Sequence, residues 1–212
     1  MNSTSPDPNP LAATLYVARH GEVDAAWRRT VYGRLDVQLS TRGVAQSHRM
    51  DTYFSGLDLA FVTTSGLVRA ETPAALIRAS HPGLERSDDP RFLELDRGDW
   101  AGRSIDDLRA QDPAAFENWV QTRGAMRAPG GESPSEVAQR ATEAFGDWAQ
   151  TAHSAGKPGL IIAHLWIVRS AVATALGLPM EHSGLLALDP GGICELRWPL
   201  DGGAPDLVRY AI

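Results

Sequence analysis

The sequence has too few cysteines for disulfides or for cysteine chemistry to shape the protein. Cys194 is the only cysteine among 212 residues, so no disulfide can form within the chain. It lies in the apolar segment GGICELRW, which favours a buried structural thiol over a reactive one. Neither a disulfide-stabilised fold nor a catalytic cysteine is therefore expected.

Excess positive charge and long apolar runs are also lacking. The formal net charge is −6, which argues against nucleic acid or an anionic membrane as the main partner. The first apolar run is interrupted by Arg19 and His20, so neither a signal peptide nor a membrane span is indicated. We therefore expect a cytoplasmic protein with a flexible Pro-, Ser- and Asn-rich tail over residues 1–12 and one domain over residues 13–212.

What the sequence does have is a series of short apolar runs. Residues 14–18, 59–64 and 159–163 are rich in β-branched side chains and show no alternation with polar residues. This pattern is typical of strands that are covered on both faces. The runs predict central strands of a parallel sheet.

Helical patterns lie between and after these runs. Ser40 or Thr41 can cap a helix that continues to Phe54, and Ser65 can cap the next helix, in which Pro73 predicts a break or kink. Residues 135–153 and 167–179 are further helices, the second ended by a glycine and a proline, and residues 185–198 predict two strands joined by a Pro-Gly-Gly turn. The alternation predicts a three-layer α/β/α sandwich with a central, mostly parallel sheet.

Basic groups follow each of the three predicted strands. Arg19 and His20 follow the first, Arg69 comes soon after the second, and His164 follows the third. Ligands of such folds gather beyond the carboxyl ends of the strands, where two guanidiniums and two imidazoles suit a phosphate group. A neutral imidazole nitrogen can also attack phosphorus and form a phosphohistidine, while the other groups neutralise charge.

An acid is needed to protonate the alkoxide that leaves. Glu94, in RFLELDRGDWAG, follows a short apolar stretch whose burial would keep its carboxyl protonated. Asp96, Asp99, Asp106 and Asp107 lie nearby and compete for this role. The residues alone leave the choice among these carboxyl groups open.

The order of these motifs resembles that of a known family. From about Leu15 onward the chain is similar to the histidine phosphatase superfamily, the phosphoglycerate-mutase-like proteins, and within it to the phosphatases. The segments that carry this resemblance are ARHGE (18–22), YGRLDVQLSTRG (32–43), TTSGLVRAETPAAL (63–76), LELDRGDWAG (93–102), PGGES (129–133) and IIAHLWIVRS (161–170).

The resemblance implies a role for each candidate residue. His20 would be the nucleophile that becomes phosphorylated, and Arg19, Arg69 and His164 would bind the phosphoryl group. Glu94 matches the proton donor that later activates water. The resemblance further implies hydrolysis of a small phosphorylated metabolite without a metal or an organic cofactor.

Several positions depart from the family pattern. Val23 and Ala26 stand where relatives often carry polar groups that hold phosphate. Leu165, in place of a glycine, and Trp166 either crowd the site or pack into the core. Arg97 replaces a common aromatic residue and is either a solvated surface group or a ligand for a second anionic group of the substrate.

Three more residues are candidates for substrate binding. Gly21 lets the backbone approach the phosphate, and Gly33 and Arg34 lie in the segment that follows the nucleophile. Residues 97–131 and the surroundings of Trp27 and Trp166 are expected to set specificity, although no motif there names the substrate.

Two other functions remain open at this point. A phosphoglycerate mutase would return the phosphoryl group to the substrate, and a regulatory relative would bind a phosphorylated ligand without turnover. The chain lacks the long insertion and extended tail of the mutase branch, and a simple binder has no need for the acid Glu94. Oligomeric state is not indicated by any motif, so a homo-oligomer is also left open.

Overall fold

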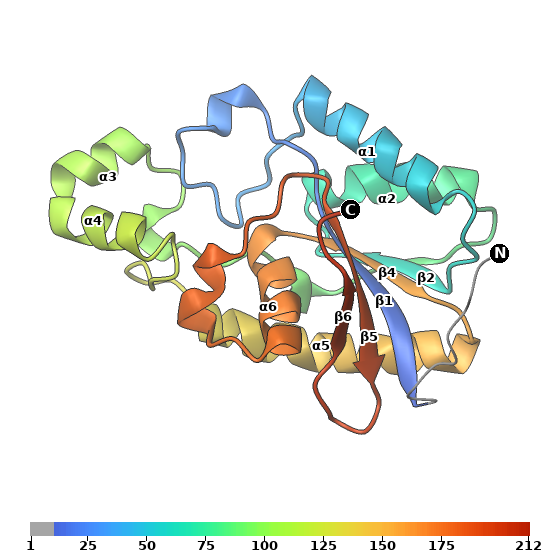
Figure 1. Cartoon of the computed structure of the whole chain (residues 1–212). Coiled ribbons are helices and arrows are strands. Elements are labelled where there is room, and N and C mark those ends of the chain that lie inside the picture. The colour runs from blue at the N-terminus through green and yellow to red at the C-terminus, as the bar shows by residue number, and fades with distance from the viewer. Residues whose placement is uncertain (1–10) are drawn as a thin grey trace.

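The computed structural model describes residues 11–212, which form a six-stranded sheet between two layers of helices (Figure 1). The strands are β1 (Ala12–Arg19), β2 (Phe61–Thr64), β3 (Arg86–Asp88), β4 (Gly159–Ala163), β5 (Ile193–Pro199) and β6 (Asp206–Arg209). They lie in the order β3-β2-β4-β1-β5-β6, with parallel pairing from β3 to β1 and antiparallel pairing at β5 and β6. The predicted α/β fold with a mostly parallel sheet is confirmed.

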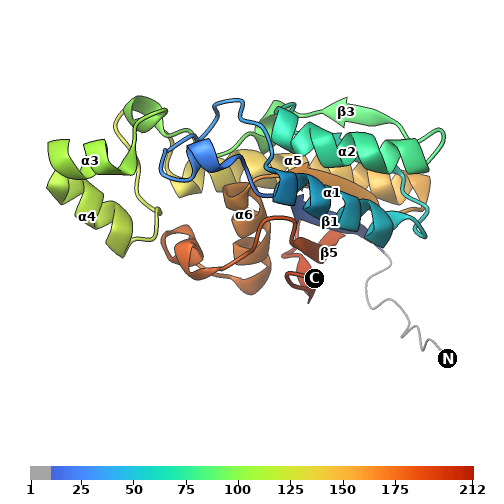
Figure 2. The ribbon, with the colours of Figure 1, turned by 90° about the horizontal axis from the view of Figure 1, so that it is seen from above.

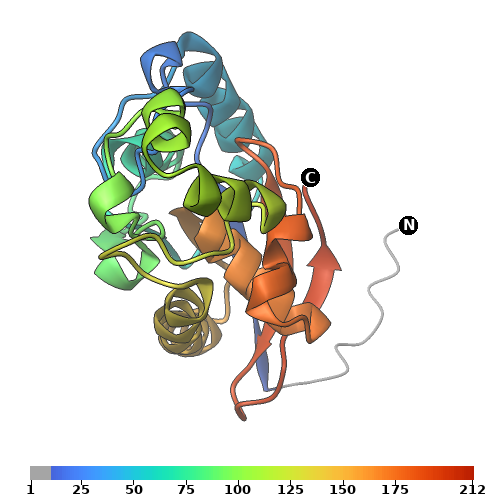
Figure 3. The ribbon, with the colours of Figure 1, turned by 90° about the vertical axis from the view of Figure 1, so that its left-hand side faces the viewer.

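Two pairs of helices cover the sheet. The α-helices are α1 (Thr41–Phe54), α2 (Val68–Ser80), α3 (Ile105–Gln111), α4 (Pro113–Gln121), α5 (Pro134–Ala155) and α6 (Leu165–Leu176). The short 3-10 helices are η1 (Ala25–Trp27), η2 (Pro90–Phe92), η3 (Gly98–Trp100) and η4 (Met180–Leu185). α1 and α2 pack together on one face, and α5 and α6 pack together on the other; Figure 3 views α5 nearly end-on.

Burial on both faces explains why the central strands are apolar throughout. Leu15 and Val17 of β1 lie in the core formed with α5 and α6, while Tyr16 and Ala18 lie in the core formed with α1 and α2. Successive side chains of a strand point to opposite faces, so a doubly covered strand has no polar face. Each large apolar side chain buried in this way contributes about 1.5–3 kcal/mol.

Local signals set where several helices begin and end. The Ser40 side chain accepts from the N–H of Gly43 over 3.0 Å and so caps α1, as predicted. Ser133 and Glu136 form a capping box at the start of α5. α6 ends at Gly177, which has a φ of 62°, a backbone conformation that glycine adopts without strain.

The start of α2 differs from the prediction. Ser65 does not cap this helix, because α2 begins only at Val68 and the preceding Leu67 makes no side-chain cap. The hydroxyl of Ser65 instead contacts a ring nitrogen of His164 over 2.7 Å. Pro73 lies inside α2 and does not end it.

The C-terminal hairpin also differs from the prediction. Residues 185–198 contain one strand, β5, whose hairpin partner is β6 and not the leucine-rich segment before the Pro-Gly-Gly turn. The carbonyls of Leu186 and Leu188 accept hydrogen bonds from Arg169 Nε (3.0 Å) and Arg19 Nη1 (2.5 Å). Arginine side chains thus occupy acceptors that a strand ladder would need.

The predicted tail over residues 1–12 falls mostly outside the described residues. Ala12, its last residue, already pairs with Pro199 as the first residue of β1. The single domain over residues 13–212 stays a prediction. In the part of the chain that the structure describes, no helix is both long and apolar enough to span a membrane.

A small lobe stands beyond the sheet. α3 and α4 lie at the end of the molecule opposite the first described residues, beside the loop that follows β1 (Figure 2). Backbone hydrogen bonds join the two: Val31 N–H donates to Arg103 O over 3.0 Å, and Ile105 N–H donates to Arg29 O over 2.9 Å. The lobe therefore forms one wall of the space at the carboxyl end of β1.

Candidate functional site

Two histidines meet at the carboxyl ends of β1 and β4. The parallel pairing sets Arg19 beside Ala163, so that His20 and His164 both follow at the same edge of the sheet. Their ring centroids are 5.2 Å apart with an angle of 62° between the ring planes. The two residues are 2% and 0% exposed. The convergence that the strand ends predicted is therefore present in the structure.

The position of one proton on His20 follows from its hydrogen bond. Nδ1 lies 2.7 Å from the carbonyl oxygen of Gly21, which can only accept, so Nδ1 carries the proton and Nε2 the lone pair. Burial, with the positive charges of Arg69 and Arg19, holds the pKa of His20 well below its ordinary value of 6.5. The ring is neutral near pH 7, with Nε2 available as a nucleophile.

His164 has the opposite tautomer. Its Nδ1 accepts from Nε of Arg69 over 3.3 Å, so its Nε2 carries the proton and donates to the Ser65 hydroxyl over 2.7 Å. Burial, then the charge of Arg69, holds the pKa of this histidine well below 6.5 as well. Two neutral imidazoles thus lie side by side, one with a free lone pair and one with an N–H donor.

Arg69 is fully buried and forms no direct ion pair within residues 11–212. Nη1 donates to the carbonyl of Leu35 over 2.6 Å and Nη2 to the carbonyl of Gly33 over 2.7 Å. These bonds and the one to His164 use three of its five N–H groups. One N–H remains on each Nη atom, so two charged donors are left that could serve an oxyanion.

Arg19 carries a buried donor that no group in residues 11–212 accepts. Its Nη1 is held by Leu188 O, but its Nε has no hydrogen-bond partner. A buried N–H without an acceptor costs about 1–3 kcal/mol, so such groups call for a ligand or water. The orphaned Nε lies one residue before the nucleophile, where an incoming anion would satisfy it.

The Glu94 carboxyl is fixed by two backbone donors. Its Oε1 accepts from Leu95 N over 2.8 Å and from Trp166 N over 3.2 Å, and the residue is 8% exposed. Because Oε1 already accepts two hydrogen bonds, Oε2 is the oxygen left free for a ligand. Among the competing carboxyl groups, Asp96 and Asp99 do not line the cavity that Glu94 lines.

Arg34 supports Glu94 from outside the cavities. Its Nε donates to the carbonyl of Glu94 over 3.0 Å, and its two Nη atoms face Asp96 at 3.4 Å and Glu132 at 2.8 Å. The same carbonyl accepts from Arg140 over 3.3 Å. Arg34 was predicted to bind substrate. Its donors instead bind the segment that contains Glu94, and Arg34 lines neither cavity.

Gly21 and Gly33 are glycines for reasons of packing. A Cβ on Gly21 would lie 2.4 Å from the carbonyl oxygen of Gly43, because the loop after His20 packs directly on the first turn of α1. Gly33 has a φ of 44°, and its carbonyl holds Arg69. Both residues are near the predicted site, and direct contact of either with substrate stays a prediction.

Two adjoining cavities open beside these groups. One of about 440 Å³ is lined by His20, Gly21 and Val23, and one of about 230 Å³ by Glu94, Gly33 and Arg97. Arg19, Arg28 and Tyr32 line both.

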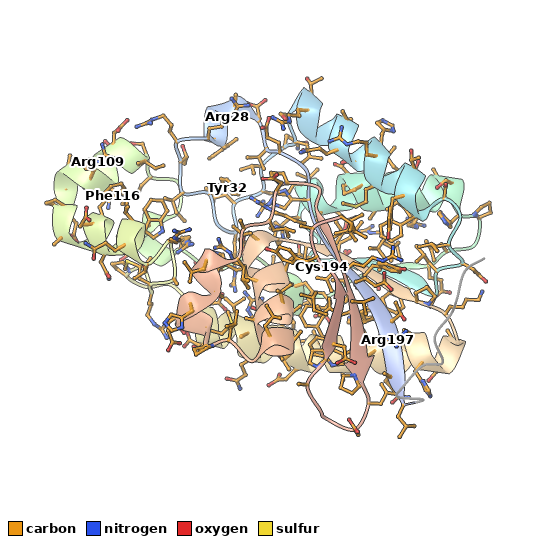
Figure 4. The ribbon with its side chains drawn as sticks, in the orientation of Figure 1. Arg28, Tyr32, Arg109, Phe116, Cys194 and Arg197 are labelled. Atoms are coloured by element: carbon orange, nitrogen blue, oxygen red, sulfur yellow. The ribbon has the colours of Figure 1, made fainter. Side chains whose placement is uncertain are left out.

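Arg28 and Tyr32 were missed by the sequence analysis, although Tyr32 begins one of the motif segments. In Figure 4, Tyr32 lies near the middle of the molecule below Arg28. Burial raises the pKa of the Tyr32 phenol, which therefore stays a neutral donor beside Arg19.

The structure shows where Trp166 and Arg97 lie, which the sequence left open. Trp166 is 3% exposed. It packs in the core and also lines the smaller cavity, so it occupies both of the places that the sequence analysis considered. Leu165 lines the same cavity. Arg97 is 8% exposed, which excludes a solvated surface arginine. Its guanidinium carbon lies 5.6 Å from the centre of the Trp166 ring.

No metal centre is evident at the site. Within residues 11–212, His, Cys, Asp and Glu side chains do not gather in threes as a metal site would require. The absence of a metal or an organic cofactor stays a prediction. The chemistry that the geometry supports is that of a neutral imidazole, an acid and several guanidiniums.

Comparison with known proteins identifies the family. The model of the histidine phosphatase superfamily (branch 1) matches residues 15–212. A probable phosphoglycerate mutase (GpmB) of Serratia proteamaculans is 32% identical over 165 residues, which are 78% of this chain and 75% of that protein.

Solved structures agree with this match. YhfR of Bacillus stearothermophilus is 27% identical with a TM-score of 0.83, covering 93% of this chain and 96% of its own. A mycobacterial glucosyl-3-phosphoglycerate phosphatase bound to inorganic phosphate is 25% identical with a TM-score of 0.81, covering 95% of this chain and 98% of its own. With its motifs in order at one edge of the sheet, the chain belongs to branch 1 of the histidine phosphatase superfamily.

Proposed function

We propose that the protein is a phosphomonoesterase that hydrolyses a small phosphorylated metabolite through a phosphohistidine on His20. One observation carries the proposal: the hydrogen bond from Nδ1 to Gly21 O leaves Nε2 of a neutral, buried imidazole as the free nucleophile among guanidinium groups. Such a nitrogen attacks phosphorus without first losing a proton.

In the first step, the Nε2 lone pair of His20 forms a bond to phosphorus. The bond between phosphorus and the ester oxygen breaks, and its electron pair goes to the alkoxide that leaves. Oε2 of the protonated Glu94 gives its proton to that oxygen. The products are phospho-His20, a neutral alcohol and the Glu94 carboxylate.

In the second step, water replaces the alcohol. Glu94 takes a proton from the water, whose oxygen forms a bond to phosphorus. The bond between phosphorus and Nε2 breaks, and its electron pair returns to His20. Inorganic phosphate is released and Glu94 is again protonated, so the cycle closes.

The surrounding donors would stabilise the charge that moves through both steps. The unpartnered Nε of Arg19 and the unused N–H groups of Arg69 would donate to the phosphoryl group. In a buried site, donors of fixed orientation need no rearrangement as charge develops, and removal of one such donor commonly costs about 10²–10³ in rate. His164, whose Nδ1 accepts from Arg69 Nε and whose N–H donates to Ser65, would help to hold Arg69 in place, and its direct binding of the phosphoryl group stays a prediction.

The relatives named as mutases favour a second candidate. A phosphoglycerate mutase would use the same phospho-His20 but pass its phosphoryl group to a second substrate hydroxyl instead of water. Hydrolysis is preferred here because the motifs resemble those of the phosphatases and because Glu94 lines a cavity that water can fill once the alcohol leaves. A binder without turnover would make no use of the fixed carboxyl.

A phosphate-release screen separates these candidates. The protein is incubated with a broad panel of phosphorylated metabolites that includes both phosphoglycerates, and free phosphate and isomerised product are measured together. We expect free phosphate from at least one metabolite. Isomerised phosphoglycerate without free phosphate would establish the mutase instead, and no reaction of any kind would favour the binder. The cytoplasmic location and the lack of a nucleic-acid or membrane partner stay predictions.

A further inference from the structure

Arg97 is a buried cation that contacts no carboxylate directly in residues 11–212, although the charge of Glu94 in the same cavity stabilises it through space. It is 8% exposed, and within residues 11–212 it takes part in no ion pair. Its one hydrogen bond runs from Nη1 to the carbonyl of Gly124 over 3.0 Å. A guanidinium does not lose its proton to avoid the cost of burial, so a buried arginine with no bound carboxylate can accommodate an anionic ligand.

The guanidinium presents an unused fork of donors. The bond from Nη1 leaves Nε–H and Nη2–H, which form one edge of the planar group, without a protein acceptor in the described chain. Two parallel N–H groups of this kind match the two oxygens of a carboxylate or phosphate. The Trp166 ring, 5.6 Å from the guanidinium carbon, helps to hold the fork in place.

A second unsatisfied donor lies beside this fork. Nε1 of Trp119 is buried and has no hydrogen-bond partner in residues 11–212. Both this nitrogen and Nη2 of Arg97 lie 3.2 Å from the position that a Cβ on Gly124 would take. Gly124 has a φ of 85°, so the chain keeps a residue without a side chain where the two donors meet.

The location of these donors decides which part of a substrate they would bind. Arg97 and Trp119 line the smaller cavity together with Glu94, whereas His20 lines the adjoining one. The acid faces the oxygen that leaves with the alcohol. A group bound by Arg97 therefore belongs to the alcohol part of the substrate and not to the phosphoryl group that is transferred.

We propose that Arg97 and Trp119 form a second oxyanion subsite, so that the substrate is a phosphate monoester whose alcohol part carries a carboxylate or a second phosphate. The proposal rests on the proposed function, because it takes the group beside Glu94 to be the leaving alcohol. It assigns to this chain's own Arg97 a role in specificity, in which it binds substrate directly.

Binding to a His20→Asn variant tests the subsite without turnover. Calorimetry compares 3-phosphoglycerate with glycerol 3-phosphate, which differ in the carboxylate, and fructose 1,6-bisphosphate with fructose 6-phosphate, which differ in the second phosphate. We expect the compound with the extra anion to bind about tenfold or more tightly in at least one pair. A preference in the first pair indicates that the subsite binds a carboxylate, and a preference in the second pair indicates that it binds a phosphate.

Substitutions in that background identify the donors. Arg97→Met is expected to abolish the preference, Arg97→Lys to weaken it by loss of the fork, and Trp119→Phe to reduce it by loss of the N–H alone. Arg109→Met is the control, because Arg109 lies in the α3–α4 lobe that also contains Trp119, its guanidinium lies over the Phe116 ring, and it lines neither cavity (Figure 4). It should leave the preference unchanged.

The proposal is overturned if neither pair shows a preference, if the preference survives Arg97→Met, or if Arg97→Met weakens both members of a pair equally. The last result would make Arg97 a purely structural support of Gly124 and Trp166. Phosphohistidine formation by the unsubstituted protein, measured in parallel, separates the two proposals. A phosphoenzyme without an anion preference refutes the subsite alone, and an Arg97-dependent preference without a phosphoenzyme refutes the proposed function alone.

Discussion

The backbone N–H of Trp166 donates to Oε1 of Glu94 over 3.2 Å. Trp166 lies in the first turn of α6, two residues after His164, whereas Glu94 lies in a loop between β3 and the α3 lobe. The hydrogen bond therefore fixes the candidate acid to the same segment that places the second histidine. The two halves of the site are held in register by a backbone donor of α6 and the carboxyl group of Glu94.

Glu94→Gln should separate acid catalysis from structure. The amide oxygen of glutamine can still accept from Leu95 N and Trp166 N, so the loop is expected to keep its conformation. We expect kcat on an alkyl phosphate to fall about 10²–10⁴-fold, with a much smaller loss on an aryl phosphate whose leaving group needs no proton. Steady-state kinetics on both substrates measure this. Equal losses would count against Glu94 as the acid.

Arg34→Gln should act through Glu94. The substitution removes the guanidinium fork that holds the Glu94 carbonyl, Asp96 and Glu132. We expect kcat on an alkyl phosphate to fall about tenfold, by misplacement of the acid, with KM nearly unchanged. A raised KM with an unchanged kcat would instead restore Arg34 as the substrate ligand that the sequence suggested.

The two buried histidines should make the fold sensitive to mild acid. Their pKa values are held well below 6.5 in the folded protein, so between pH 6.5 and the folded values the unfolded chain binds more protons. Stability therefore falls as the pH decreases below about 6.5, by up to about 1.4 kcal/mol per pH unit for each histidine.

Urea unfolding at pH 7.5 and 5.5 checks this expectation. The unsubstituted protein should lose more stability between the two values than a variant in which both His20 and His164 are asparagine. Asparagine does not titrate, so carboxyl groups elsewhere contribute equally to both proteins. The same loss of stability in both would contradict the assignment of buried neutral imidazoles.

Gly43→Ala should loosen the loop that carries His20. A Cβ on Gly43 would lie 2.0 Å from the carbonyl oxygen of Glu22, so backbone must shift, at a cost of about 1–3 kcal/mol. Gly146→Ala in α5 is the control, because a Cβ there meets nothing within 4 Å and alanine favours a helix by about 1 kcal/mol. Thermal unfolding should shift in opposite directions for the two variants. A shift in the same direction would contradict the close packing of the loop on α1.

Much of this architecture could be predicted from the sequence because the central strands are continuous apolar runs. Residues 159–163 form β4 with the predicted bounds, since a strand buried on both faces is apolar throughout. The meeting of His20, Arg69 and His164 follows from parallel pairing alone, because each comes after a strand that ends at the same edge. The placement of these three residues could therefore be predicted before the structure.

The features that escaped prediction depend on contacts between distant residues. The burial of Arg97 requires the carbonyl of Gly124, 27 residues later, and the ring of Trp166. Ser65 has the pattern of a helix cap, but its hydroxyl accepts from Leu67 N just before α2 and contacts His164, which lies 99 residues later. β6 is short and largely exposed, so its sequence has no apolar signal that would reveal its pairing with β5. Local sequence patterns do not indicate contacts with residues that lie far away in the chain.

The central claim is that Nε2 of His20 becomes phosphorylated during turnover. Rapid alkaline quenching followed by mass spectrometry of the peptide that contains His20 tests it directly, with an active phosphate monoester as substrate. The account predicts a phosphoryl group on His20 that forms within a turnover, accumulates in Glu94→Gln where water is poorly activated, and is absent in His20→Asn. Turnover by His20→Asn at the unsubstituted rate, or a phosphoryl group on His164 instead of His20, would contradict it.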